Sequence, residues 1–236
     1  MTISFVLNLN TETSNVYDDY LYMLYNNLGD EGQGSIHADL IESSLILSLA
    51  AGRTSHINQT ELYLTIGLTD KGLDQWETII VRIFQFINHL KTISNNDITE
   101  YYSKLKRSSS NLWQCKPEEP GYRNVETISL RMQNHKSTKW VSGDLIAEEC
   151  DPNLFISIVN QLTPNNFFIM MQSKKFENLT DKTENISKAK YSIQDIEPSF
   201  IEKLFHLKKN EKLFTRKRSS LVDQPMILTW SSLVLK

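Results

Sequence analysis

A chain of 236 residues with 40% hydrophobic and 22% charged residues has a globular composition, with room for one sizeable core or two small ones. A net charge of −3 gives no reason to expect a nucleic-acid or anionic-membrane partner, and no apolar run is long enough to span a bilayer. The amino terminus lacks a signal-peptide pattern, so we expect a cytoplasmic protein with no nucleic acid and no membrane among its partners.

The first third of the chain predicts a strand followed by two helices. Apolar residues alternate with polar ones over 3–9, which is typical of a strand with one face on a core. Ser14 or Asn15 can cap a helix that runs to Leu28. A shorter helix is expected over 35–43, with Ser35 as its cap. Between these two helices lies a turn with three glycines, which predicts close packing of the backbone.

Two strands and two long helices follow. The apolar run 45–51 and the alternating run 61–69 predict a hairpin, with the polar segment 53–59 as its loop. Apolar residues at helical spacing predict a core helix over 70–91, with Thr69 as its cap. Another amphipathic helix is expected over 95–106, after which the three serines at 108–110 are expected to loosen the chain.

The remaining elements are two helices and a strand. Val125, Ile128 and Met132 mark a helix beyond Pro120, and a second helix is expected over 151–162. The apolar run 167–171 is short enough to be a buried strand. The order predicts an α+β fold with one mainly antiparallel sheet covered by several helices on one side.

The glycine-rich turn belongs to a series of spaced motifs. The turn is not a nucleotide-binding loop, because it has neither the GxGxxG spacing after a strand nor a Walker lysine. Further motifs follow it in a fixed order. They are Gly29–Ile36, Leu47–Gly52, Leu68–Leu73, Phe84–Leu90, Pro120–Tyr122, Leu162–Asn166, Ser173–Glu177 and Thr180–Glu184.

This series resembles the insulysin and pitrilysin family of zinc metallopeptidases, and in particular the second, non-catalytic middle domain of its four homologous domains. The resemblance covers residues 1–213 and implies the fold of a mitochondrial-processing-peptidase or insulysin-like domain. It fails over 214–236, a divergent tail with basic and apolar residues. The basic cluster at 208–218 could contact nucleic acid, but at a chain end it is more often a solvated tail.

The resemblance also implies a substrate-binding site. In the family, this domain offers a strand edge to the amino-terminal end of a peptide, which adds as an extra strand. The matching positions are Gly29, Glu31, Leu49, Ala50, Ala51 and Gly52, with the Glu31 carboxylate placed to pair with a peptide α-amino group.

Several positions depart from the family pattern. Ala51 stands where relatives have glycine, and Asp30 stands where they commonly have histidine. Tyr22 and Tyr25 replace a histidine and a glycine that help to shape the pocket. The alternative is that 47–52 is an ordinary core strand and Glu31 an ordinary loop charge.

Catalytic motifs are missing from the sequence. The five histidines include no HxxEH or HExxH pair, so we expect no cofactor in this chain and zinc on a separate catalytic domain. Cys115 and Cys150 form no CxxC ligand pair or disulfide framework, and no GxSxG elbow occurs. A self-sufficient hydrolase would need a metal site that the sequence does not contain.

The sequence therefore predicts a non-catalytic, substrate-binding and chamber-forming domain of an insulysin-like metalloendopeptidase. Its expected partners are peptide substrates and the other domains of the same peptidase, and oligomerisation stays open. The alternative is a free-standing peptide-binding or assembly module with no protease attached.

Overall fold

The computed structural model describes residues 1–8, 14–55, 59–115, 120–134, 136–143, 150–210 and 212–213. The tail 214–236 and the histidines at 56 and 135 lie outside these residues. The described elements, in chain order, are β1 (Thr2–Leu7), α1 (Ser14–Leu28), α2 (Ile36–Glu42), β2 (Ile46–Ser55), β3 (Thr60–Leu68), α3 (Asp70–Asp74), α4 (Trp76–Leu90), α5 (Asn95–Gln114), α6 (Gly121–Asn134), η2 (Ser137–Lys139), α7 (Pro152–Asn160), β4 (Phe167–Met170), η4 (Lys174–Phe176), β5 (Lys182–Thr183), β6 (Lys190–Tyr191) and α8 (Pro198–Phe205).

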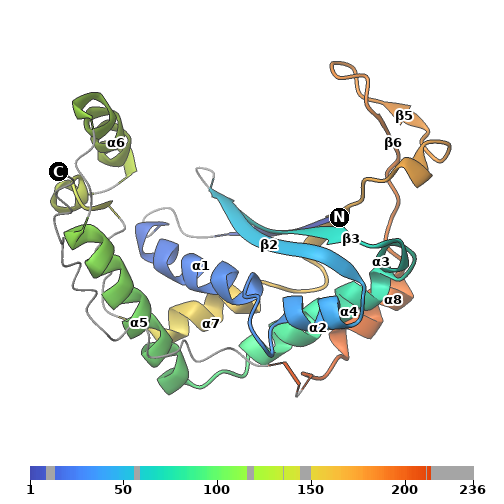
Figure 1. Ribbon diagram of the computed structural model, residues 1–236, viewed down its shortest axis with the longest axis horizontal. Helices are drawn as coiled ribbons and strands as arrows, with labels where there is room; N and C mark the ends of the chain where they lie inside the picture. Colours follow the sequence, from blue (N-terminus) through green and yellow to red (C-terminus); the bar gives the residue numbers. More distant parts are fainter. Residues whose placement is uncertain are drawn as a thin grey trace, which may run out of the picture.

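Four antiparallel strands form the central sheet, in the order β2-β3-β1-β4. Side chains alternate across the pleat, so one face carries the buried residues, which are Ile3, Phe5, Leu7, Leu62, Leu64 and Ile66. Figure 1 shows α1, α2, α4 and α7 packed beneath that face, with the β5–β6 hairpin and α6 rising at the two ends of the molecule. The predicted α+β fold with a mainly antiparallel sheet is confirmed.

Helix α4 provides the largest part of the helical side of the core. Seven of its residues are buried, and Phe84 lies edge-on to two rings of the sheet. Its ring centroid is 5.9 Å from that of Phe5 on β1 and 5.2 Å from that of Phe167 on β4. Edge-to-face contacts of this kind add to the free energy gained from burying the rings. They hold α4 against the centre of the sheet.

The helix expected over 70–91 is two helices, α3 and α4, with Gln75 between them at φ −115° and ψ 33°. Thr69 caps α3 as expected, accepting a hydrogen bond from Gly72 N. The break displaces the helical phase too little to disturb the apolar spacing, so the sequence pattern could not reveal it. Trp76 begins α4 and packs edge-on against Phe200 of α8, with the ring centroids 5.7 Å apart.

Two other predicted boundaries were wrong. Residues 53–55, expected in the hairpin loop, continue β2 and pair with 60–62 of β3, because the backbone ladder does not require apolar side chains. Residues 108–110 lie inside α5, which runs to Gln114, since serine lowers helix stability only slightly.

Strand β4, at the other edge of the central sheet, is less buried than expected. Phe168 and Met170 are each 49% exposed, and β1 is the only described strand that pairs with β4. An edge strand with one face on the core exposes every second side chain. The apolar run 167–171 therefore predicted a strand correctly but gave the wrong burial.

Candidate functional site at the edge of strand β2

Strand β2 lies at an edge of the sheet. It pairs with β3, and no other strand of the described part pairs with it. The Met1 amino group donates to Ile66 O at 2.9 Å, and Ile66 N donates to Met1 O at 2.8 Å, so both main-chain groups of Ile66 face the β1 side. Because these groups alternate along an antiparallel strand, those of Thr65 face β2, where Thr65 lies opposite Ala50.

The main-chain groups of Ala50 therefore face β3, and those of its neighbours Leu49 and Ala51 face the free edge. The Leu49 side chain is only 4% exposed and belongs to the core, and Ala51 packs partly buried against the same core. This stretch consequently offers its N–H and C=O groups, rather than its side chains, to anything that approaches the edge. Unpaired main-chain groups in a row are a template for another strand.

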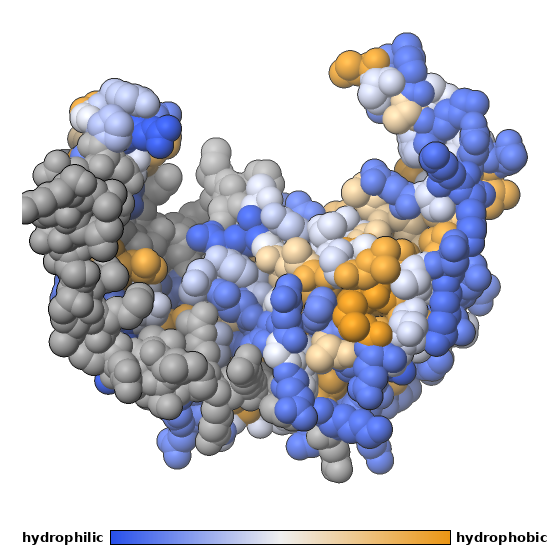
Figure 2. Space-filling view, viewed as in Figure 1, coloured by the Kyte–Doolittle hydropathy of each residue, from blue (hydrophilic) through white to orange (hydrophobic). Residues whose placement is uncertain are grey.

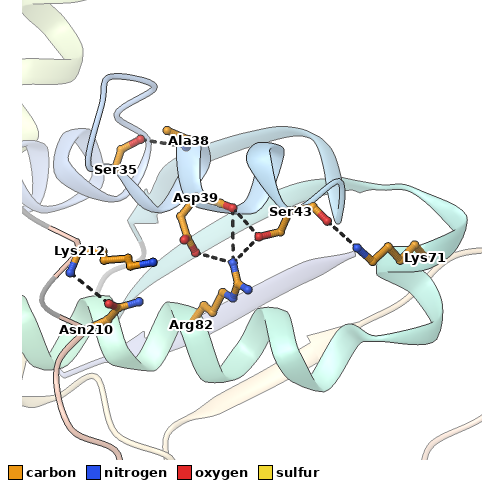
Figure 3. Close-up of polar contacts among 8 residues, drawn as sticks. All are labelled: Ser35, Ala38, Asp39, Ser43, Lys71, Arg82, Asn210 and Lys212. Atoms are coloured by element: carbon orange, nitrogen blue, oxygen red, sulfur yellow. Dashed lines mark hydrogen bonds and ion pairs between the residues drawn. The ribbon is translucent and has the colours of Figure 1, made fainter.

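Helix α2 and its links to α4 fix the start of β2. Ser35 caps α2, because its Oγ accepts a hydrogen bond from Ala38 N at 3.1 Å. Figure 3 shows Arg82 of α4 reaching up to the end of α2. Its Nη1 donates to the Asp39 carboxylate at 2.7 Å and to Ser43 Oγ at 2.6 Å. This charge-assisted network holds the two helices together beneath β2.

The turn between α2 and β2 is fixed by the residues that open α3. Thr69 Oγ1 donates to Ser44 O at 2.9 Å, and Lys71 Nζ donates to Ser43 O at 2.8 Å. Gly72 packs so closely that a Cβ placed on it would lie 1.8 Å from Leu45 O. The turn therefore requires glycine at this position, and the Leu68–Leu73 motif serves to position the first residues of β2.

Two buried tyrosines, Tyr20 of α1 and Tyr102 of α5, connect α1 to its neighbours. Tyr102 of α5 donates to the Asp19 carboxylate at 2.8 Å, and Asp151 N donates to the Tyr20 hydroxyl at 2.6 Å. The two rings stack with centroids 5.3 Å apart. Burial, followed by the bond to Asp19, raises the pKa of Tyr102. The neutral hydroxyl thus ties α1 to α5 at ordinary pH.

The end of α1 brings Gly29 against the β2 edge. Gly29 N donates to Tyr25 O at 2.9 Å. A Cβ placed on Gly29 would lie 3.2 Å from Tyr25 O and 3.4 Å from Ala51 N, so a side chain there would be crowded between the helix end and the strand. Gly29 and Ala51, two positions of the predicted site, therefore lie close together in the structure.

Glu31 extends into solvent from the glycine-rich turn. The turn itself is closed by Asp30, whose carboxylate accepts a hydrogen bond from Gly32 N at 2.6 Å. Glu31, the next residue after Asp30, is exposed. The structure therefore places Gly29 and Ala51 together and leaves the Glu31 carboxylate accessible beside them.

Gly52 has a role that the sequence did not suggest. A Cβ placed on it would lie 2.7 Å from the hydroxyl oxygen of Tyr63, its partner on β3. The tyrosine ring therefore crosses Gly52 on the face of the sheet opposite the core. The glycine accommodates that ring, and this contact gives one physical reason for a small residue at position 52.

Two exposed aliphatic residues flank the start of the edge and were absent from the predicted site. Leu47 is 70% exposed and Ile41, near the end of α2, is 40% exposed. Figure 2 shows an apolar patch at the level of β2 on this side of the molecule. The sequence did mark Leu47 as part of an apolar run, but it could not show that a β-bulge turns this residue outward.

Other kinds of site are scarce in the described part of the chain. Among the residues described, no group of three or more His, Cys, Asp or Glu side chains could hold a metal ion. Cys115 is exposed, and both cysteines are free thiols. None of the helices in the described ranges has the length and apolar character needed to cross a membrane.

Comparisons with known proteins show that the chain is similar to peptidases. A family model described as the middle or third domain of peptidase M16 matches residues 113–217. The nardilysin-like protein of Arabidopsis thaliana is 28% identical over 191 residues, which is 78% of this chain. The insulin-degrading enzyme of Mus musculus is 24% identical over 183 residues, or 77% of the chain. The chain spans 18% of the length of each of these two relatives.

Solved structures give the same result for the fold. Pitrilysin superposes over 86% of this chain and 21% of its own, with a TM-score of 0.71 and 18% identity. The periplasmic protease PqqL from Escherichia coli superposes over 86% of this chain and 22% of its own, with a TM-score of 0.52 and 13% identity.

Another relative, the insulin-degrading enzyme-like 1 of Arabidopsis thaliana, is named as peroxisomal, so the cytoplasmic location of this chain stays a prediction.

Proposed function

This chain resembles the middle domain of the insulysin and pitrilysin zinc metallopeptidases, and from that premise we propose that it is a non-catalytic, substrate-binding domain of such an enzyme. A peptide adds to the free edge of β2 as an extra strand, with its amino-terminal end beside Gly29 and Glu31. Peptide hydrolysis then takes place at zinc on a separate domain.

The observation that carries this proposal is the outward direction of the Leu49 and Ala51 main-chain groups. Added strands bind mainly through backbone hydrogen bonds, which give affinity with little dependence on sequence. The missing side chain at Gly29 lets the turn after α1 pack against Ala51 at this point of the edge. The exposed Glu31 carboxylate lies on the neighbouring turn, where it can attract the positive charge of a peptide amino terminus.

The shape of the molecule supports a place in the wall of an enclosed chamber. Figure 1 shows the sheet face opposite the helices lying between the α5–α6 side and the β5–β6 hairpin, and Figure 2 shows the hollow between these two arms. A chamber wall with a strand edge at its margin could hold one end of a long peptide. The alternative, a free-standing peptide-binding module, uses the same edge without a protease.

Peptide binding to the purified chain tests the proposal. We expect a long unstructured peptide with a free amino terminus to bind, as measured by fluorescence anisotropy. Acetylating the peptide should weaken binding by up to about fivefold, as expected for the loss of an exposed ion pair. Glu31→Gln should weaken binding of the free peptide equally, and acetylation should then have no further effect.

Backbone methylation of the peptide provides the control for strand addition. Methylating the amide nitrogens of alternate residues removes the N–H groups on one side of an extended peptide only. One of the two alternating series should abolish binding, and the other should leave it nearly unchanged. Equal effects of both methylated series would contradict strand addition. In the acetylation experiment, a Glu31→Gln variant that binds the free peptide as tightly as the original chain would remove Glu31 from the site.

A further inference from the structure

Leu47 is an exposed leucine in a strand whose neighbouring apolar residues are buried. Ile46 is 3% exposed and Leu49 is 4% exposed, whereas Leu47 is 70% exposed. The register shifts between Ile46 and Ser48, so that an extra residue faces the partner strand there. The bulge lets both Ile46 and Leu49 reach the core and directs Leu47 away from it.

The residues around Leu47 leave its side chain accessible. A Cβ placed on Gly67 of β3 would lie 3.7 Å from Leu47 Cβ, so the missing side chain of Gly67 leaves this side of the leucine uncovered. Ile41 lies six residues before Leu47, near the end of α2, and its carbonyl oxygen accepts a hydrogen bond from Ser44 N at 2.8 Å in the turn that leads to β2. Leu47 and Ile41 are 70% and 40% exposed, and Figure 2 shows that apolar residues gather on this face of the molecule.

The position of the patch relative to the edge decides what it can contact. Gly29 abuts Ala51, so the turn after α1 borders the edge at that point. From Ala51 the edge continues past Leu49 to Leu47. In antiparallel pairing, which is slightly more stable per residue than parallel pairing, a peptide that begins at Ala51 extends toward Leu47. Roughly its fourth or fifth residue then lies beside Leu47.

We propose that Leu47 and Ile41 form a side-chain-selective subsite on the β2 edge, which favours peptides with a large aliphatic or aromatic residue about four or five positions from a free amino terminus. This inference rests on the proposed function. Backbone pairing gives affinity without sequence preference, and the subsite adds selectivity by burying one apolar side chain of the peptide against two of the domain.

A set of peptides that differ at one position at a time tests the subsite. Each peptide is otherwise polar and unstructured, and leucine replaces alanine at each of the first seven or so positions in turn. We expect one position, the fourth or fifth, at which leucine binds roughly three- to tenfold more tightly than alanine. Aspartate at that position should bind no better than alanine.

Variants of the domain separate the subsite from the edge. Leu47→Asn should reduce the ratio of leucine-peptide to alanine-peptide affinity at the preferred position to about one. Leu112→Asn is the matched control, because Leu112 of α5 is 62% exposed and lies outside the site. It should retain the full preference. Thermal melts of both variants check that folding is intact.

The outcomes distinguish the two proposals. The subsite would be overturned, with strand addition intact, if binding needs the peptide N–H groups but no peptide position prefers leucine. A leucine preference that survives in Leu47→Asn would overturn the subsite in the same way. Binding that is insensitive to peptide backbone methylation, or no binding at all, would overturn both. Loss of the preference in Leu47→Asn alone would establish the subsite.

Discussion

The two sides of β2 meet very different surroundings. On its inner side, β2 pairs with β3, and the preceding turn is fixed by Thr69, Lys71 and Gly72. On its outer side, the main-chain groups of Leu49 and Ala51 have no strand partner among the described residues. Extensive packing on one side holds the other in an extended conformation that is ready to pair. The difference indicates that the β3 side of β2 stabilises the fold, whereas its free edge is the side available for binding.

The largest predicted effect breaks the inner side at Gly72. A Cβ in Gly72→Ala would overlap Leu45 O, which is backbone and cannot rotate away. We expect a loss of about 3 kcal/mol in the free energy of unfolding, measured in urea. Gly121→Ala is the control, since nothing lies within 4 Å of a Cβ there, and it should be neutral or stabilising by up to about 1 kcal/mol. Equal effects of the two substitutions would contradict the close packing at Gly72.

A smaller loss is predicted for Arg82→Ala, which removes the bonds from α4 to Asp39 and Ser43. Both charged side chains are partly exposed, at 27% and 21%, so we expect a loss of about 1–2 kcal/mol. Lys104→Ala removes an exposed i,i+4 pair with Glu100 and should cost less than about 0.5 kcal/mol. If Arg82→Ala and Lys104→Ala melt at the same temperature, the Arg82–Asp39–Ser43 network contributes no more to stability than an exposed ion pair.

The smallest predicted effect concerns Gly52 and Tyr63. Gly52→Ala should displace the tyrosine ring and cost about 1 kcal/mol, because the contact is with the end of a side chain that can move. In the background of Tyr63→Ala, the same substitution should cost nothing or stabilise the strand slightly. A double-mutant cycle by chemical denaturation measures the difference. Additive effects would mean that Gly52 is small for another reason, such as close approach of a peptide.

Much of the fold followed from local patterns in the sequence. The caps at Ser35 and Thr69 and the alternation in β1 and β3 were correctly predicted, because each depends on residues near one another in the chain. The break at Gln75 and the length of α5 were missed, since tertiary packing and small helix propensities decide them. The predicted burial of β4 was wrong because its place at the edge of the sheet depends on strand order, which local sequence does not determine.

The candidate site was predictable only in part. The motif positions predicted a site around Gly29 and Ala51, and the structure places these two residues close together, whereas peptide binding there stays a prediction. An apolar run such as 45–51 cannot distinguish a central strand from an edge strand, because strand order depends on contacts far apart in the chain. The outward turn of Leu47 arises from a bulge, which pairing with β3 creates. The Gly52–Tyr63 contact likewise needs the register of two strands.

Amide hydrogen exchange, measured by NMR with and without a bound peptide, tests the central claim most directly. Without peptide, the Ala50 amide should already be protected by its bond toward β3, whereas the Leu49 and Ala51 amides should exchange quickly. A saturating peptide should slow exchange at Leu49 and Ala51 by an order of magnitude or more and leave Ala50 unchanged. A peptide that binds without changing exchange at these two amides would contradict strand addition at the β2 edge.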